Sequence, residues 1–240
     1  NDFDNDLDLD IVIGGSYIKG QYGSGGNTVF YVNEGLTFKE IELLSDELVY
    51  DMQFANLDSD EVLELVVVGH WFPITIFDNL ETIPSNTEVK NSSGLWFSVE
   101  LNDFDKDGVI DLLAGNFGLN HDLNVDQDNP LRLYYNDFDK NGRYEALITT
   151  MEKEREVPYF GHETFIDQLP IVKRDFMKAS DFANASIRDI IDNEKLRQSN
   201  QKQITELRSS IYKLKDDNWV RGELTNDVLK FPVTNIVYNK

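Results

Sequence analysis

The sequence predicts an all-β protein built from repeated sheets that resemble the blades of a β-propeller. A row of acidic side chains followed by an apolar strand occurs four times, at residues 2–10, 56–64, 103–111 and 137–145. These copies begin 54, 47 and 34 residues apart, intervals of the order of one propeller blade. Between them lie short segments that alternate apolar and polar residues, as half-buried strands do.

The segments after the first two copies predict strands in the same order. After the first copy, residues 11–13 predict a short strand, and a glycine-rich turn leads to an alternating strand at 28–33 followed by a second short strand at 36–38. After the second copy, residues 65–69 and 74–77 repeat this plan. Each repeat is therefore expected to be a sheet of several short antiparallel strands.

Copies two to four are each preceded by a predicted strand, at 49–55, 95–101 and 131–135. The repeated loops are thus expected to join two strands of a blade. No strand precedes the first copy, so we expect the sequence to start inside a blade. With four to five blades, it is expected to be a segment of a larger propeller of four-stranded blades.

Helical signals replace the alternation at residues 158–204. Thr164 is a candidate cap of a first short helix, Pro170 suits the first turn of a second, and Ser180 is a candidate N-cap of a third at 181–191. This region is expected to be a helical insertion whose apolar face is a candidate docking surface. The side chains on that face are Phe182, Ala183, Ile187, Ile190 and Ile191.

Alternation returns at 205–214 and again at 228–237, which predicts further blade strands. The expected organisation is therefore a propeller region at 1–157, the helical insertion at 158–204, and further propeller strands at 205–240.

The repeated loops predict metal sites. Each places oxygen-bearing side chains at its positions 1, 3, 5 and 9, and a hydrophobic residue at position 2. Carboxylates this close repel one another unless a hard cation lies among them, and Ca²⁺ takes six to eight oxygen ligands. Position 7 varies freely, which suits a backbone carbonyl ligand. The candidate Ca²⁺ ligands are Asp2, Asp4, Asp6, Asp8, Asp10, Asn56, Asp58, Asp60, Glu64, Asp103, Asp105, Asp107, Val109, Asp111, Asp137, Asp139, Asn141, Arg143 and Glu145.

Two other kinds of loop are rich in acidic residues. An EF-hand carries a bidentate Glu at position 12, where this chain has Ile13, Val67, Ala114 and Ile148, so EF-hands are excluded. A plain acidic turn needs no metal, because Asp, Asn and Gly are favoured in turns by themselves. Four copies in register favour the metal over the turn.

The four loops are not equivalent. The loop at 103–111 has carboxylates at all four ligand positions and Gly108 at its bend, whereas the first loop carries Leu7 at that place. The loop at 56–64 has no glycine and starts with Asn56, so it is the one expected to be empty or degenerate.

Composition narrows the class of partner and the compartment. The net charge is −22 and the isoelectric point is about 4.3, which excludes nucleic acid and disfavours anionic lipid surfaces. Without cysteine, neither a disulfide framework nor a thiolate zinc site can form. No segment is long and apolar enough to span a membrane. Ca²⁺ loops of weak to moderate affinity fill where calcium is millimolar, so we expect an extracytoplasmic protein.

No catalytic residue is predicted. The sequence has no Gly-x-Ser-x-Gly, His-Glu-x-x-His or phosphate-binding glycine motif. The histidines, His70, His121 and His162, are better explained as hydrogen-bonded structural residues than as catalytic ones. Two carboxylates without fixed spacing suffice for a glycosidase, so that alternative stays open.

Aromatic residues near loops and strand ends are candidates for stacking on sugars or for anchoring a protein partner. In the alternative interpretation they fill the space between blades. These residues are Tyr17, Tyr22, Trp71, Phe72 and Trp96.

The chain resembles the FG-GAP/VCBS repeats of integrin α-like β-propellers, and bacterial ASPIC/UnbV-type proteins in particular. The resemblance lies in SGLWFSVELNDFDKDGVID at 93–111, GNFGLN at 115–120 and LYYNDFDKNG at 133–142, with QLP at 168–170 and KASDFANASI at 178–187 in the helical part. It implies an exported or surface-attached seven-bladed propeller, often a lipoprotein, whose strand-joining loops bind Ca²⁺. It implies no known substrate.

Together these expectations describe a non-enzymatic, calcium-stabilised module that binds a protein or a glycan at the cell surface, an outer-membrane complex being one candidate partner. The alternative is a secreted polysaccharide hydrolase or lyase with a carboxylate pair in the propeller channel.

Overall fold

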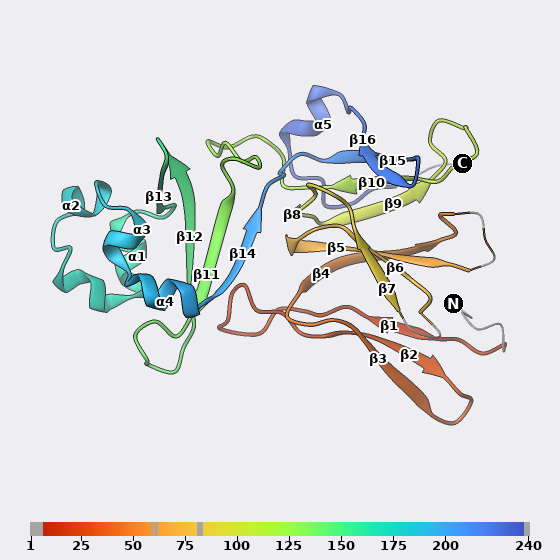
Figure 1. Cartoon of the computed structure of the whole chain (residues 1–240), viewed down its shortest axis with the longest axis horizontal. Coiled ribbons are helices and arrows are strands. Elements are labelled where there is room, and N and C mark those ends of the chain that lie inside the picture. Colours follow the sequence, from red (N-terminus) through yellow and green to blue (C-terminus); the bar gives the residue numbers. More distant parts are fainter. Residues whose placement is uncertain (1–6, 59, 61, 81–83, 238–240) are drawn as a thin grey trace. The chain divides into compact units, whose positions relative to one another are not determined.

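The computed structural model describes residues 7–58, 60, 62–80 and 84–237. Antiparallel strands make up most of its regular structure, which confirms the all-β class (Figure 1). The chain forms two compact units. Unit 1 contains Asn1–Ser16, Gly25–Asp122 and Glu206–Lys240, and unit 2 contains Tyr17–Ser24 and Leu123–Thr205.

Two sheets of unit 1 follow the chain in order. The first has the order β1-β2-β3, with strands β1 (Ile11–Ile13), β2 (Thr28–Asn33) and β3 (Phe38–Leu44). The second has the order β4-β5-β6-β7, and β8 also pairs with β5. Its strands are β4 (Leu48–Ala55), β5 (Glu64–Phe72), β6 (Thr75–Asp78), β7 (Ser85–Glu88) and β8 (Gly94–Leu95).

The third sheet of unit 1 is interrupted in sequence. Its order is β16-β15-β10-β9, with β9 (Ser98–Asn102), β10 (Asp111–Gly115), β15 (Ser210–Lys215) and β16 (Asn218–Arg221). Strand β10 pairs directly with β15, although the whole of 123–205 lies between them in the chain. Most of unit 2 is therefore inserted between two neighbouring strands of one sheet.

The three sheets of unit 1 pack face to face around β5. Val66 and Val68 of this strand join a core cluster with Val99 and Leu112 of the third sheet. Leu65 and Val67 join a second cluster with Phe30 and Val32 of the first sheet. Successive side chains of a strand point to opposite faces, so the uninterrupted apolar run of β5 fills both interfaces. Figure 1 shows this stacking of the three sheets.

Unit 2 combines one sheet with a group of short helices. The sheet has the order β13-β12-β11-β14, and consists of β11 (Leu131–Asn136), β12 (Glu145–Glu152), β13 (Arg155–Pro158) and β14 (Asn200–Ile204). The helical segments are α1 (His162–Gln168), η1 (Pro170–Arg174), α2 (Ala179–Ala183), α3 (Ile187–Ile190) and α4 (Asn193–Gln198). Side chains of Phe165, Phe182 and Leu196 pack with Tyr134 and Leu147 of the sheet.

The helices differ from the expected ones in detail. Helix α1 begins after Gly161, so Thr164 lies inside it. Ser180 also lies inside a helix, because the expected helix at 181–191 is divided into α2 and α3, and Ser186 forms the capping box of α3. The apolar side chains Phe182, Ile187 and Ile191 are buried in the core of unit 2. They stabilise the insertion internally and do not form a free docking face.

The structure also differs from the expected strands at 205–214 and 228–237. Residues 205–209 are not in a strand, and only 210–215 of the expected strand at 205–214 forms β15. Residues 228–237 were expected to be a strand, which is wrong: Asn226–Lys230 form helix α5, and 232–237 have no regular structure. Alternation of apolar and polar residues does not form a strand unless the segment also pairs with a neighbouring strand. The N–H of Val233 donates to the carbonyl of Asn116, and the Val233 carbonyl accepts from the Ser98 hydroxyl at 3.3 Å.

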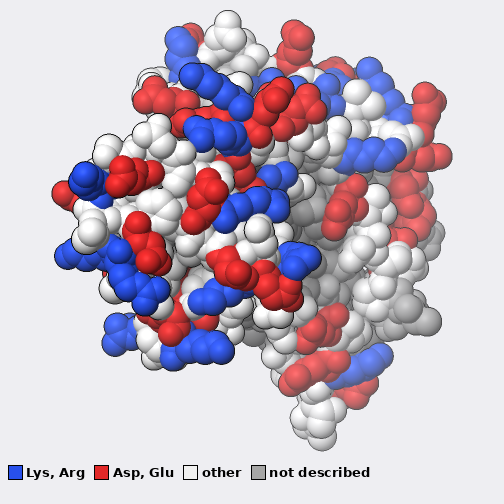
Figure 2. Space-filling view, turned by 60° about the vertical axis from the view of Figure 1, so that its left-hand side comes forward, with Lys and Arg blue, Asp and Glu red and all other residues white. Residues whose placement is uncertain are grey.

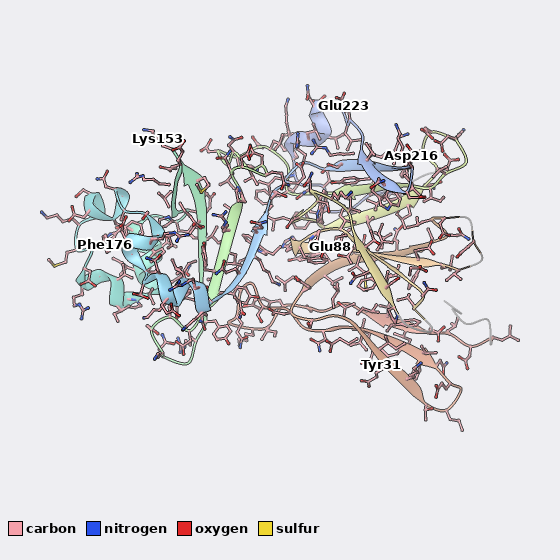
Figure 3. All side chains as sticks on the ribbon, in the orientation of Figure 1. Tyr31, Glu88, Lys153, Phe176, Asp216 and Glu223 are labelled. Carbon is pink, nitrogen blue, oxygen red and sulfur yellow. The ribbon has the colours of Figure 1, made fainter. Side chains whose placement is uncertain are left out.

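The helical region does not form a separate unit. The helices do lie within 158–204, but they share a core with β11 and β12, and the loop at 137–145 belongs to unit 2. Phe176, labelled in Figure 3, lies among the helices and packs against this core.

The acidity is concentrated in unit 1. Unit 2 contains 13 Lys and Arg against 15 Asp and Glu, which gives a net charge of −2 and leaves −20 for unit 1. On the face shown in Figure 2, basic and acidic side chains are intermingled over much of the surface. Strong electrostatic repulsion of anions is therefore a property of unit 1 more than of unit 2.

Candidate metal sites

Three of the four repeated loops bring their carboxylates together. The clusters are Asp58, Asp60 and Glu64; Asp103, Asp105 and Asp111; and Asp137, Asp139 and Glu145. Within each cluster one oxygen from every residue lies within 4.8 Å of the others. Ca²⁺–oxygen bonds are about 2.3–2.6 Å long, so ligands on opposite sides of the ion lie about 5 Å apart. The spacing therefore fits one such ion per loop.

The loop at 103–111, between β9 and β10, is held by hydrogen bonds from its own backbone. Both carboxylate oxygens of Asp103 accept from N–H groups, those of Asp107 at 3.0 Å and Gly108 at 2.9 Å. Asp105 accepts from the N–H of Asp107 at 3.2 Å, and Asp107 accepts from that of Val109 at 2.9 Å. Asp107 is not a member of the carboxylate cluster, although the sequence made it a candidate ligand.

The loop at 137–145, between β11 and β12, repeats this pattern position by position. Asp137 accepts from the N–H groups of Asn141 and Gly142, each at 2.8 Å. Asp139 accepts from Asn141 at 3.1 Å, and the Asn141 side chain accepts from Arg143 at 2.8 Å. The same local sequence thus gives the same bend in two different units.

The bend requires left-handed backbone at two positions. Gly108 and Gly142, at position 6, have φ of 90° and 85°, and Lys106 and Lys140, at position 4, have φ of 64° and 62°. Glycine adopts this region without the steric cost that a Cβ carries. The sequence identified the glycines; nothing in the identity of a lysine signals the second position.

The loop at 56–64, between β4 and β5, keeps part of the pattern. Asp58 accepts from the N–H of Asp60 at 3.1 Å, and Asp60 accepts from that of Val62 at 2.6 Å. Asn56 differs from the aspartate of the other loops because its side-chain amide donates to the carbonyl of Asp60. The carboxylate cluster is nevertheless formed, and the expectation of an empty site stays a prediction.

The first loop is only partly described. Its candidate ligands Asp2, Asp4 and Asp6 lie outside the described residues. Leu7 has φ of 77°, so it adopts the same left-handed conformation as Gly108 and Gly142 at the same loop position. Asp10 is buried, and its carboxylate accepts a hydrogen bond from the N–H of Asn33 on β2 at 2.8 Å. Asp8 is half-buried.

Position 9 carries a buried carboxylate in all four loops, and it closes three of them. Glu64, Asp111 and Glu145 are each the first residue of a strand, and each accepts from the N–H of the residue at position 2. These bonds, to Leu57, Phe104 and Phe138, are 2.6, 3.2 and 2.8 Å long. Burial raises the pKa of Glu64, Asp111 and Glu145 above the usual range. A buried carboxylate is stabilised when a cation binds beside it.

One oxygen is left without a partner by this arrangement. Oε2 of Glu64 bonds the N–H of Leu57, whereas the buried Oε1 has no hydrogen-bond partner among the described residues. A buried carboxylate oxygen without a hydrogen-bond partner destabilises the folded state, and coordination of a cation would give this oxygen a partner. The donor set, all oxygen with several carboxylates, suits Ca²⁺ better than softer metals.

The position-7 residues Val109 and Arg143 donate their N–H groups to the position-5 side chains. Coordination by their backbone carbonyls stays a prediction.

A lysine also reaches the third loop. Lys213 on β15 forms an ion pair with Asp105, and its Nζ lies 3.9 Å from Oδ1 of Asp111. The hydrogen bond from Lys213 lowers the pKa of Asp105, and the same bond raises the pKa of Lys213. This ammonium partly neutralises the cluster. Sequence reasoning missed it, because Lys213 is 108 residues from Asp105 and is placed there only by the pairing of β15 with β10.

His121 and His162 make the expected hydrogen bonds, whereas the buried Nε2 of His70 has no hydrogen-bond partner among the described residues. His70 stacks on Tyr50 with ring centroids 3.9 Å apart and meets Phe97 edge to face at 4.8 Å. Burial lowers the pKa of His70 to about 4. The Nε2 atoms of His121 and His162 lie 2.7 Å from the carbonyl oxygens of Gly118 and Phe176.

The aromatic candidates fall into two groups. Trp71, Phe72 and Trp96 are buried, and the Trp96 indole donates to the carbonyl of Ser92 at 2.6 Å. These three fill the core of unit 1. Tyr17 and Tyr22 are exposed and belong to unit 2.

No protein-family model, curated protein or solved structure matches the chain. In the part of the chain that the structure describes, no helix is long and apolar enough to cross a membrane.

Proposed function

We propose that the chain is a non-enzymatic, calcium-stabilised binding module whose stacked sheets are blades of a β-propeller, and that it binds a protein or glycan outside the cytosol. The observation that carries the proposal is the buried carboxylate at position 9. It begins a strand, bonds back to position 2 and faces two further carboxylates in three loops.

We expect the loops to stabilise the pairing of the strands that they join. Each one joins two adjacent antiparallel strands, so fixing its shape fixes the pairing of β4 with β5, β9 with β10 and β11 with β12. Ca²⁺ would neutralise carboxylates that otherwise repel one another across this turn. Asp103, Asp105 and Asp111 would hold the ion in the third loop, and Asp137, Asp139 and Glu145 in the fourth.

The resemblance to FG-GAP/VCBS repeats and to ASPIC/UnbV-type proteins supports the propeller and the extracytoplasmic location. Face-to-face packing of three sheets around β5 is also the way propeller blades bury their apolar surfaces. Millimolar calcium outside the cytosol would keep such loops filled. The hydrolase or lyase alternative has no specific observation among the described residues in its favour.

Thermal unfolding with and without a chelator tests the proposal. Binding to the folded state alone stabilises it by about 4 kcal/mol when the free ion exceeds its Kd about 1,000-fold. We therefore expect EGTA to lower the melting temperature by many degrees and added Ca²⁺ to restore it. Metal analysis of the purified protein is expected to find calcium. An unchanged melting curve together with absent calcium would falsify the proposal.

A further inference from the structure

A cavity of about 720 Å³ lies within unit 2, beside the fourth repeated loop. Its walls come from three segments of this unit: the loop at 17–24, the end of the 137–145 loop with the start of β12, and the region from Phe160 to Pro170. This volume is in the range of small-ligand pockets, which is about 300–1,000 Å³.

Four exposed aromatic rings converge on this cavity. Tyr17 is 55% exposed, Tyr22 41%, Tyr144 38% and Phe160 36%. Aromatic rings normally bury most of their surface, so four partly exposed rings around one cavity form an apolar surface that a ligand can cover.

Polar groups without partners lie among the rings. The side chains of Arg143, Asp167 and Gln168 line the cavity, and the structure gives them no hydrogen bond or ion pair with another described residue. A guanidinium, a carboxylate and an amide are planar groups that can each engage two neighbouring hydroxyls at once.

The tyrosine-bearing loop is held in place. A Cβ on Gly23 would lie 2.6 Å from Cδ2 of Leu133 and 3.1 Å from the ring of Tyr135, so the loop backbone lies directly against β11. The φ of Gly23 is 95°, which also requires glycine. Inside the loop, the N–H of Gly20 donates to the Tyr17 hydroxyl at 2.9 Å. Tyr17 and Tyr22 are thus presented by an anchored loop.

The charges of the site disfavour an anionic ligand. Arg143 is accompanied in the cavity lining by two carboxylates, those of Asp167 and Glu145. A phosphate or a polyuronate needs an excess of positive charge, whereas a neutral ligand does not. Unit 2 has a net charge of only −2, so the surrounding protein neither attracts nor repels strongly.

We propose that this cavity binds a short neutral oligosaccharide, with aromatic rings covering the apolar C–H faces of the sugars and with Arg143, Asp167 and Gln168 bonding their hydroxyls. This proposal rests on the proposed function, and it specifies the class of glycan that the module binds. Sugar rings combine an apolar face with an edge of hydroxyls, and the cavity offers the complement of both.

The site is coupled to the fourth loop. Asn141, Arg143 and Glu145 line the cavity and also occupy positions 5, 7 and 9 of that loop. An ion bound in this loop would also order one wall of the cavity, so the two binding events would strengthen each other by linkage.

The test is isothermal titration of the full chain with neutral oligosaccharides of the β-glucan, xylan, mannan and α-glucan types, and with oligogalacturonate as the acidic probe. At millimolar Ca²⁺ we expect at least one neutral oligosaccharide to bind. Tyr144→Ala and Asp167→Asn should each weaken it at least tenfold. Phe38→Ala removes an exposed ring of unit 1 and should leave the affinity unchanged. EGTA should weaken binding several-fold.

The outcomes separate the two proposals when melting temperatures are measured on the same samples. A melting temperature lowered by EGTA without any neutral oligosaccharide bound overturns the cavity proposal alone, and so does binding of oligogalacturonate only. Sugar binding that Tyr144→Ala and Asp167→Asn leave unchanged, in variants that melt like the parent, places the sugar elsewhere and also overturns it. An unchanged melting temperature with sugar bound in the cavity overturns the calcium proposal alone.

Discussion

The N–H of Phe138 donates to Oε2 of Glu145 at 2.8 Å, and this bond ties the second position of the fourth loop to its ninth. Phe138 is buried in the core of unit 2, so the bond also fixes the loop to that core. The same relationship joins Leu57 to Glu64 and Phe104 to Asp111. Each loop is therefore a closed ring in which a buried carboxylate is both a backbone acceptor and a candidate ligand.

The third loop is expected to contribute more to calcium-dependent stability than the second. At millimolar Ca²⁺, Asp105→Ala with Asp107→Ala should lower the melting temperature by several degrees more than Asp58→Ala with Asp60→Ala. The reason is that the third loop has a carboxylate at all four ligand positions, whereas the second loop has the neutral Asn56 at position 1. One kcal/mol corresponds to about 2–4 °C for a chain of this size. In EGTA the difference in melting temperature between the two double variants should shrink. A difference that persists in EGTA would mean that the predicted calcium binding by these loops is wrong.

Lys213 is expected to weaken calcium binding at the third loop. Its ammonium pairs with Asp105 and lies near Asp111, so a divalent ion must displace it or bind beside it. Lys213→Met should tighten the binding of one Ca²⁺ by about tenfold, as measured in competition with a chromophoric chelator.

Lys215→Met is the matched control for that experiment. It removes the same charge from the same strand, at an exposed position without an ion pair among the described residues. Equal affinities in the two variants would show that the position of Lys213 is unimportant.

His70 is expected to make the protein less stable in acid. Its pKa is about 4 in the folded protein against about 6.5 when unfolded, because burial between Tyr50 and Phe97 disfavours the charged ring. The unfolded state binds the proton first as the pH falls, so the contribution is complete above pH 6.5 and is lost between pH 6.5 and 4. The loss is at most about 3 kcal/mol.

Denaturant unfolding between pH 6.5 and 4 measures this loss of stability. His70→Phe keeps a flat ring without a titrating group, so its stability should fall less between pH 6.5 and 4 than that of the parent. Parallel curves for the two proteins would exclude His70 as the cause.

Gly142 is expected to be required for its backbone conformation alone. Its φ is 85° and no atom lies within 4 Å of a Cβ built on it, so Gly142→Ala meets no obstacle but the left-handed φ. The cost should be about 1 kcal/mol in chemical denaturation. Gly142→Asn should cost less, since Asn tolerates this region better. Equal losses for Ala and Asn would point to a steric cause instead.

Much of this protein was predictable because its signals are local. A loop whose ligands lie within nine residues is specified by neighbours in the chain, and the sequence therefore located three carboxylate clusters and the two left-handed glycines. Alternation located β2 at 28–33 without error, since a half-buried strand carries its own period of two.

Features that depend on distant partners could not be predicted in this way. Apolar alternation at 228–237 predicted a strand, but helix α5 covers Asn226–Lys230 and residues 232–237 have no regular structure. The interruption of the expected helix at 181–191 has a local cause instead, because the capping box formed by Ser186 and Asp189, three residues apart, starts a new helix.

The sequence by itself determined the repeated loops, their oxygen donors and the β-rich class, because these follow from side-chain chemistry over a few residues. Only the tertiary structure decided that β10 pairs with β15 across the insertion, that Lys213 reaches Asp105, and that Tyr17 and Tyr22 join Tyr144 around one cavity. These contacts join residues about 100 or more positions apart. Such pairs are selected by packing and strand pairing of the whole fold, which no local pattern encodes.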